Sequence, residues 1–579
     1  MKQGILITIL LFLLAFSLNA IEITAGNYNN NVQLLQSGPE HIVMQLTLGH
    51  FTSEPVNING NTWNLLSLKK EGVTLQTGYP QLPIIARSVI IPNTANMELS
   101  VLDTEYVEMT LPVAPSKGNL TRDIDPETVP YSFADFYSGN DFWPKELSYL
   151  TEPFILRDYR GITVRFQPFA YYPATQTLRI YTKITVALDV NGTDLTNSLP
   201  VAKTSYAEEF APIYENMFLN FNEAKYPSLA EQGRILAIKN SMFDNVIQPW
   251  VDWKRQNGYR VDVVDVSVAG PTATQIKTYI QNQYNLNDGL MFVQIFGDAP
   301  QVPTLTSGGG GSDPSYSLLA GSDSYPDIYV GRFSAQSVAE METQITRSIH
   351  YERDVQTGSQ WVQRAMCIAS NQGGGSQGDM GESDQQHQEN IRTDLLNYGY
   401  LSVDQIYESM GATAAQVSTN LNQGRGFINY TGHGADTYWV TTGFSNTNVN
   451  ALTNDYMLPF IQSVACVNGN FVSMTCFAEA WLRSVNETTN APAGAIGFYG
   501  SSINQSWNPP MRAQDETVDL LVAEQKHTLG GLFYNGSSKM IEVYGQDGIS
   551  MFLTWNIFGD CSLMVRSKDP QPITATYTP

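Results

Sequence analysis

The sequence is poor in cysteine, and this shortage limits what holds the chain together. Its 579 residues include only Cys367, Cys466, Cys476 and Cys561, all in the C-terminal half. Four such positions cannot form a dense disulfide framework, and no pair has the Cys-x-x-Cys spacing of a metal site. One structural disulfide is still possible. Free thiols in an exported chain would instead suggest that at least one cysteine has a chemical role.

Basic residues are also scarce. The 32 Lys and Arg residues face 55 Asp and Glu residues, so the formal net charge is −23. Binding to a phosphate backbone needs a basic stripe, so nucleic acid is not an expected partner. An acidic field favours cationic partners or substrates.

Long apolar runs are missing after the first twenty residues. The start, "MKQGILITILLFLLAFSLNA", combines Lys2, an apolar stretch and a small residue, Ala20. This pattern predicts a secretory signal peptide over residues 1–20. An uncleaved anchor is the alternative, but the apolar run is short for a membrane span. We therefore expect an extracytoplasmic protein, secreted or at the cell surface, without a transmembrane anchor.

The remaining chain changes character near residue 226. Residues 21–225 contain alternating runs such as "GITVRFQPFAYYP" and "TLRIYTKITVALDV" between turn residues, which predicts a β-rich, sandwich-like domain. From residue 226, apolar strands alternate with helical patterns, which predicts an α/β domain with a mostly parallel sheet and helices on both faces. We divide this part into residues 226–360 and 361–567, followed by a tail, 568–579.

Two chemically versatile residues follow apolar strands in this second part. His433 comes after "FINYT" and Cys466 after "FIQSVA". Functional residues of parallel sheets gather at the carboxyl ends of strands, so adjacent strands can bring the two together. Cys466 would then be a nucleophile, His433 its base, and the N–H groups of Gly434 and Cys466 an oxyanion hole. The alternative is a turn histidine and a core cysteine.

Other motifs are weaker. Neither Gly-rich segment, "SGGGGSDPS" or "NQGGGSQGD", continues into the Gly-Lys-Ser/Thr of a phosphate-binding loop, and there is no His-Glu-x-x-His zinc motif. Four aspartates, Asp298, Asp313, Asp323 and Asp327, offer hard oxygen ligands that suit calcium. Ordinary turn caps explain them equally well.

Several longer stretches carry a family resemblance. "NYTGHGADT", "LPFIQSVACVNGN", "FVSMTCFAEAWLR" and "INQSWNPPMRAQDE" closely resemble the gingipain family of secreted cysteine peptidases, in particular its arginine-specific members. The upstream stretches "GYPQLPIIARSVIIP" and "APSKGNLTRDIDPETVPYSF" resemble the gingipain propeptide. The resemblance covers nearly the whole chain. It implies a caspase-like fold, structural calcium and a zymogen.

The resemblance assigns roles to single residues. It places the nucleophile on Cys466, the general base on His433 and an oxyanion donor on Gly434. The acidic residue that orients the histidine in arginine-selective members falls on Gln372, a departure that weakens support for an imidazolium.

The resemblance also implies a substrate pocket. Asp384 would lie at its base, Trp507 would form its lid, and Thr431 and Val464 its walls. A buried carboxylate pairs well with a guanidinium, so protein or peptide substrates with Arg before the cleaved bond are expected, and Lys second. Without the resemblance, Asp384 is more simply a helix N-terminal acid.

The β-rich domain becomes an inhibitory propeptide in this interpretation. A basic residue would fill the substrate pocket; we expect Lys145, with Arg157 and Arg160 as alternatives. Processing is expected between Lys225 and Tyr226. The sequence thus predicts a secreted cysteine endopeptidase zymogen that cleaves after Arg. The rival is a catalytically silent surface-binding or adhesion module on the same scaffold, which Gln372 favours.

Overall fold

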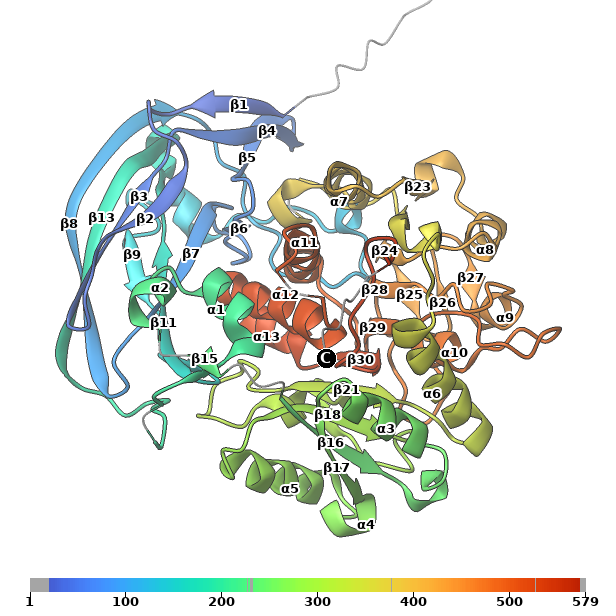
Figure 1. The fold of residues 1–579 in the computed structure, drawn as a ribbon. Coiled ribbons are helices and arrows are strands. Elements are labelled where there is room, and N and C mark those ends of the chain that lie inside the picture. Colours follow the sequence, from blue (N-terminus) through green and yellow to red (C-terminus); the bar gives the residue numbers. More distant parts are fainter. Residues whose placement is uncertain are drawn as a thin grey trace, which may run out of the picture.

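A computed structural model describes residues 20–201, 203–225, 228–229, 233–375, 377–525 and 527–572. Residues 1–19 of the expected signal peptide, Tyr226 at the expected processing point and residues 573–579 of the tail lie outside this part. Figure 1 shows a β-rich N-terminal part, in blue to cyan, beside an α/β part, in green to red. No helix in the described ranges is long and apolar enough to cross a membrane.

The N-terminal part contains three antiparallel sheets. Their strand orders are β1-β4-β5, then β10-β11-β7-β6 with β9 on β11, and β12-β13-β3-β2 with β8 on β13. The strands are β1 (Ile21–Thr24), β2 (Asn31–Ser37), β3 (His41–Thr47), β4 (His50–Ile58), β5 (Asn61–Ser67), β6 (Gly72–Val73), β7 (Pro83–Ile90), β8 (Ala95–Thr110), β9 (Ser148–Leu150), β10 (Phe154–Leu156), β11 (Tyr159–Phe166), β12 (Phe169–Tyr172) and β13 (Thr177–Thr193).

The three sheets share one apolar core. Leu46 and Val186 from one sheet, Val89 and Val164 from the second and Phe51 from the third belong to a single buried cluster. Alternate residues of each strand supply this core, as period-two patterning requires. The predicted β-rich, sandwich-like domain is confirmed. Four short elements follow it: β14 (Tyr206–Ala207), α1 (Ala211–Met217), α2 (Phe221–Ala224) and β15 (Ser228–Leu229).

The α/β part is built on a ten-stranded sheet of order β17-β16-β18-β21-β30-β29-β28-β24-β22-β23. All neighbouring strands are parallel except β29 and β30. The strands are β16 (Arg234–Lys239), β17 (Arg260–Asp265), β18 (Leu290–Phe296), β21 (Tyr329–Phe333), β22 (Arg364–Ala369), β23 (Ser402–Tyr407), β24 (Phe427–Thr431), β28 (Phe460–Val464), β29 (Gly497–Ser501) and β30 (Trp555–Gly559).

The sheet has a weak seam between β21 and β30, where a single backbone pairing, Arg332 with Phe558, joins the strands. The seam separates four strands within residues 234–333 from six strands within residues 364–559. Two small sheets lie outside it: β19 (Leu305–Ser307) with β20 (Gly310–Ser312), and β25 (Gly434–Ala435) with β26 (Tyr438–Trp439) and β27 (Phe444–Ser445).

Helices cover both faces of the sheet. On β22, Ala365, Cys367 and Ala369 belong to one apolar cluster, whereas Met366 and Ile368 belong to another on the opposite face. A strand buried on both faces is typical of parallel α/β sheets. The helices are α3 (Gln248–Gln256), α4 (Val266–Ala269), α5 (Ala273–Asn285), α6 (Val338–Arg353), α7 (Asp384–Tyr398), α8 (Ala414–Asn422), α9 (Asn446–Asn450), α10 (Phe477–Arg483), α11 (Asn508–Val522), α12 (Leu529–Tyr544) and α13 (Gln546–Phe552). The predicted α/β fold is confirmed.

The N-terminal part packs against this domain near α11 and α12, which lie between the two sheet systems in Figure 1. The Ser88 hydroxyl donates to the Glu542 carboxylate over 2.6 Å, and Lys70 pairs with Asp519 at 2.6 Å. The first of these contacts is buried and the second is partly exposed, and the buried one helps to fix the orientation of one part on the other.

Candidate active site

Strand register brings the two predicted catalytic residues to one place. β24 and β28 are parallel neighbours, and Thr431 pairs with Val464 at their carboxyl ends. The Gly432 N–H then donates to the Val464 carbonyl over 3.1 Å. His433 and Cys466 each follow two residues after the paired ends, so the fold places both at the same edge of the sheet.

Gly434 lies directly against the loop that carries Cys466. A Cβ atom at this position would lie 2.3 Å from the Cys466 carbonyl oxygen and 2.9 Å from the Ala465 Cβ atom. Only glycine permits this approach, because any side chain would overlap the backbone of Cys466. The approach brings the Gly434 N–H to the Cys466 sulfur.

The Cys466 thiol is almost completely buried in this structure, with an exposed fraction of 3%. Burial raises its pKa to about 11, because the thiolate loses its hydration. Hydrogen bonds from the backbone of Gln505 and Gly434 and the nearby charge of Arg122 act in the opposite direction and lower the pKa. The sulfur therefore sits among groups that favour a thiolate, but with water excluded.

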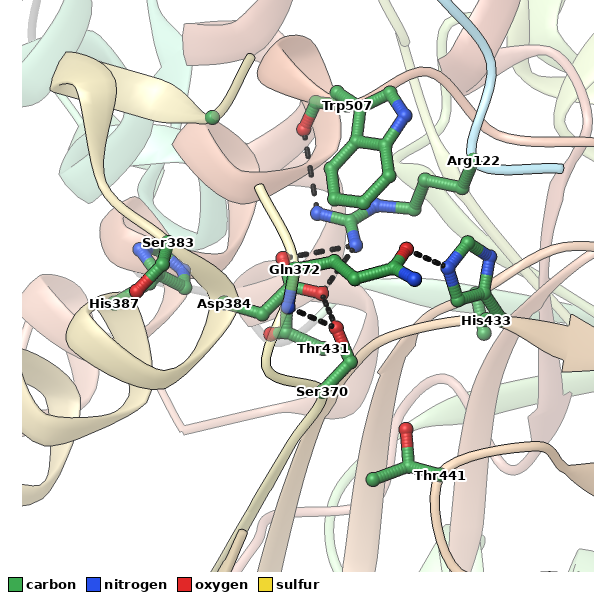
Figure 2. Close-up of polar contacts among 12 residues, drawn as sticks. Arg122, Ser370, Gln372, Ser383, Asp384, His387, Thr431, His433, Thr441 and Trp507 are labelled. Atoms are coloured by element: carbon green, nitrogen blue, oxygen red, sulfur yellow. Dashed lines mark hydrogen bonds and ion pairs between the residues drawn. The ribbon is translucent and has the colours of Figure 1, made fainter. Parts of the chain in front are cut away.

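His433 is held by Gln372. The Nε2 atom of its ring lies 2.5 Å from the Gln372 Oε1 atom (Figure 2). With that oxygen as acceptor, Nε2 carries the proton and Nδ1 keeps its lone pair. The His433 carbonyl accepts hydrogen bonds from the Tyr430 hydroxyl and the Val440 N–H, which fix the backbone. The imidazole is thus oriented with one nitrogen available as a base.

Asp384 begins α7, with Ser383 as the N-cap, and its carboxylate is fully buried. The Ser370 hydroxyl donates to Oδ2 over 2.6 Å, and the Asp384 N–H donates to the Gln372 carbonyl over 2.9 Å. The second contact ties the floor of this pocket to the residue that holds His433.

The partner of Asp384 comes from the N-terminal part. Arg122 Nη1 lies 2.9 Å from each carboxylate oxygen, and neither side chain is exposed to solvent. The guanidinium also lies 4.4 Å from the centre of the Trp507 ring, and its Nη2 donates to the Trp507 carbonyl over 3.4 Å. Figure 2 shows the guanidinium between the indole and the carboxylate. An arginine therefore fills the pocket: its Nη1 and Nη2 atoms donate to Asp384 and Trp507 and its guanidinium stacks on the indole, while its buried Nε has no partner among the described residues.

The backbone around Arg122 runs antiparallel to residues 505–507, with Thr121 opposite Ser506. The Arg122 N–H donates to the Gln505 carbonyl over 2.7 Å, and the Trp507 N–H donates to the Leu120 carbonyl over 3.1 Å. An added strand of this kind is how many proteins bind extended peptides.

The chain reverses immediately afterwards. The Ile124 N–H donates to the Thr121 carbonyl over 3.0 Å, so Arg122 and Asp123 are the central residues of a β-turn. Trp507 Nε1 donates to the carbonyls of both Thr121 and Ile124 at 3.2 Å. The indole thus holds the turn closed.

The prediction for Lys145 is wrong. Its side chain is 76% exposed and pairs with Asp141 at 3.4 Å. Arg157 and Arg160 are buried elsewhere, where they bond to backbone carbonyls. Arg122 was missed, although the stretch "NLTRDIDP" carries a usable signal: a basic residue among turn-forming Asn, Asp and Pro.

Thr431 and Val464 lie at the paired strand ends beside this pocket. The Thr431 hydroxyl donates to the Gln514 Oε1 atom over 2.7 Å and accepts from Gln388 over 2.8 Å, and the Ser370 N–H donates to its carbonyl. Val464 is fully buried within the largest apolar cluster. Thr431 thereby supports the serine that contacts Asp384.

The four aspartates predicted as calcium ligands do not converge. In the described ranges no group of three or more His, Cys, Asp and Glu side chains could hold a metal ion. Asp313 forms an ion pair with Arg332, Asp298 contacts Arg483, Asp323 accepts from the Ile155 N–H, and Asp327 accepts from three backbone N–H groups. The residues therefore fit protein donors rather than one calcium ion, and that set of ligands is a wrong prediction.

Comparisons with known proteins agree with this geometry. A family model described as Peptidase family C25 matches residues 228–566, and one described as Propeptide_C25 matches residues 23–228. Gingipain R1 of Porphyromonas gingivalis is 41% identical over 518 residues, which are 87% of this chain and 52% of that protein. Gingipain R2 of the same organism is 40% identical over 518 residues, or 70% of its length. The chain thus spans about half the length of Gingipain R1.

Two solved structures resemble the fold. The crystal structure of the Arg specific cysteine proteinase gingipain R has a TM-score of 0.57 and 40% identity, and the match covers 58% of this chain and 79% of that chain. The complex of Porphyromonas gingivalis RgpB pro- and mature domains has the same TM-score and identity and covers 58% of this chain and 81% of that chain.

Together these findings define the class of the protein: a caspase-like fold of the gingipain type, in which a C25 propeptide region precedes a C25 peptidase region. The match to the peptidase model extends over more than half of the sequence. The chain therefore belongs to peptidase family C25.

Proposed function

We propose that the chain is the zymogen of a cysteine endopeptidase that hydrolyses peptide bonds after Arg. The observation that carries this proposal is the arginine already in the pocket: Arg122 places its guanidinium on the buried Asp384 carboxylate and against Trp507. The propeptide strand that carries it pairs with residues 505–507 as a peptide substrate would. A lysine could reach Asp384 but lacks the planar group that stacks on the indole, so it is a weaker substrate.

The proposed reaction begins when the propeptide leaves the cleft. The Cys466 thiol passes its proton to Nδ1 of His433, and the thiolate adds to the carbonyl carbon of the substrate Arg. The N–H groups of Gly434 and Cys466 bind the oxyanion. The imidazolium then protonates the leaving amine, the C–N bond breaks, and a thioester remains.

Water completes the cycle. His433 takes a proton from the attacking water, the thioester carbon–sulfur bond breaks, and the product acid and the Cys466 thiol are released. Throughout these steps the Gln372 amide keeps the ring oriented. It stabilises the imidazolium less than a carboxylate would, because it carries no charge.

Latency follows from the same contacts. Arg122 fills the pocket, but the turn from Thr121 to Ile124 carries the chain out of the cleft after Arg122, whereas a substrate continues in extended form. The Lys117 ammonium donates to the Pro126 carbonyl over 2.8 Å and ties the two sides of the loop together. The propeptide thus inhibits as a substrate mimic that presents no extended bond for cleavage.

Activation and location belong to the same proposal. Cleavage after Lys225, which lies exposed after α2, would separate propeptide from peptidase. Secretion or display at the cell surface suits both the expected leader sequence and the gingipain relatives. A calcium ion would need ligands other than the four aspartates, because these already contact protein donors. No step of the proposed reaction depends on calcium.

One observation favours a second candidate, a catalytically silent binding module on this scaffold. Gln372 replaces the expected acid beside His433, so the catalytic pair has weaker electrostatic support.

Hydrolysis of matched peptide reporters with Arg, Lys or Ala before the cleaved bond tests the proposal. We expect Arg-dominant turnover by the processed protein and none by Cys466→Ala. Processed protein without turnover on any reporter would support the silent module instead.

A further inference from the structure

Gln505 connects the nucleophile loop to the strand that binds the propeptide. Its side chain is completely buried, and its Oε1 atom accepts the Ala465 N–H over 3.2 Å, one residue before the nucleophile. The neighbouring Ile503 carbonyl accepts the Val467 N–H over 3.0 Å, one residue after it. Residues 503–505 therefore run along the loop that carries Cys466 and bond to both of its flanks.

The backbone of the same residue faces the reacting groups. The Gln505 carbonyl accepts the Arg122 N–H over 2.7 Å. Its backbone also hydrogen-bonds to the Cys466 thiol and lowers the thiol pKa, although burial dominates. One residue thus contacts the nucleophile and the residue that would precede the cleaved bond.

The side chain is a poor choice for stability alone. Its Nε2 atom is buried and has no hydrogen-bond partner among the described residues. A buried donor without a partner is unfavourable, and an apolar side chain of equal length would avoid it. The amide oxygen, which anchors the strand to Ala465, is the part that a function would use.

We propose that Gln505 is a positioning residue, whose side-chain bond to Ala465 holds the 503–507 strand so that the substrate carbonyl arrives in register with the Cys466 sulfur. This inference rests on the proposed peptidase function. A strand that drifts by a fraction of an ångström would still bind peptide but would present the carbonyl at the wrong distance.

The test uses the full-length chain, expressed as precursor and matured. Gln505→Met keeps the length and volume of the side chain but removes the acceptor. Gln505→Glu keeps an acceptor for the Ala465 N–H. The matched control is Gln462→Met, because Gln462 is equally buried on β28 and neither of its side-chain polar atoms has a partner among the described residues.

Two readouts are needed: kcat and KM on an Arg reporter, and the pH profile of Cys466 alkylation by iodoacetamide. We expect Gln505→Met to lower kcat by about tenfold to a hundredfold with KM within about threefold. Its alkylation profile should move up by about one pH unit, because the N–H of residue 505 is no longer aimed at the sulfur. Gln505→Glu should recover kcat to within about threefold at its own optimum pH, and Gln462→Met should match the wild type.

Several other outcomes would overturn the proposal. Unchanged kcat and an unchanged alkylation profile in Gln505→Met would overturn the proposal, as would a loss in KM alone or an equal loss in Gln462→Met. If the wild type cleaves no reporter, the proposed function fails, and the alkylation profiles alone decide: a shift confined to Gln505→Met supports the positioning of the sulfur, and no shift refutes it.

Discussion

The contact between Arg122 and Asp384 makes a quantitative prediction about inhibition. The propeptide has its own apolar core, so residues 21–225 are expected to fold when expressed alone. Added to the matured enzyme, this fragment should inhibit hydrolysis of an Arg reporter. Replacing Arg122 by Ala in the fragment removes the side chain that fills the pocket, here called the plug, and leaves the remaining interface intact.

The magnitude follows from the burial of both partners. Neither side chain of the pair is exposed, so the Ala variant leaves the Asp384 carboxylate desolvated and unpaired in the complex. Breaking a buried pair in this way costs about 3–5 kcal/mol. Since about 1.4 kcal/mol is a factor of ten, the inhibition constant should rise by about 10² to 4 × 10³. Arg122→Lys keeps the charge but loses the stacking on Trp507 and the Nη2 donor to the Trp507 carbonyl. We therefore expect the inhibition constant to rise by about tenfold.

The assay is the inhibition constant of each fragment, with Lys145→Ala as the matched control. Lys145 is exposed and pairs with Asp141 of its own loop, so its variant should inhibit like the wild type. An Arg122→Ala fragment that inhibits within about threefold of the wild type would refute the assignment of Arg122 as the plug. A large loss in Lys145→Ala would do the same.

Three further predictions concern Gln372, Cys466 and Asp323. Gln372→Leu should lower kcat by about a hundredfold because His433 loses its orienting acceptor. A Leu variant as active as the wild type would contradict the orienting role. In the precursor, burial raises the pKa of the Cys466 thiol to about 11, so at pH 7.5 iodoacetamide should label the precursor at least about a hundredfold more slowly than the matured enzyme; equal rates would mean that the thiol is already accessible and ionised. Burial raises the pKa of Asp323, which lies against the propeptide, to about 7, although the Ile155 N–H of the propeptide donates to the carboxylate and lowers the pKa; because burial is the larger effect, we expect the complex to take up a proton as it forms and its affinity to fall as pH rises through 7. The inhibition constant of the fragment should therefore fall by about tenfold from pH 7 to pH 5, less so for Asp323→Asn, and inhibition that weakens on acidification would contradict this linkage.

The placement of His433 and Cys466 at one edge of the sheet could be predicted from the sequence because it depends on periodicity. The runs before His433 and Cys466 are short, apolar and bounded by turn residues, so they had to be buried parallel strands, and strand ends of one sheet meet at one edge. The register of Thr431 with Val464 then required only that the two strands be neighbours.

The pocket around Asp384 could not be predicted from patterns in the same way. An acid at the start of a helix has the same sequence signature whether it faces solvent or receives a guanidinium from a distant loop. Asp384 pairs with a residue 262 positions away, and nothing local to either one reports the other. The family resemblance supplied Asp384, but it left several basic loop residues as candidates for the plug.

The choice between those basic residues depends on which side chain is buried away from water in the folded protein, and the sequence does not show this. Arg122 and Lys145 both lie in polar loops of the propeptide, yet the first is fully buried and the second is mostly exposed. The aspartates proposed for calcium failed for the same reason. Asp313 has the oxygen atoms that a cation needs, but Arg332 already lies within 2.6 Å of them. A carboxylate can satisfy a metal, a guanidinium or a row of backbone N–H groups, and only the tertiary packing decides which of them reaches it first.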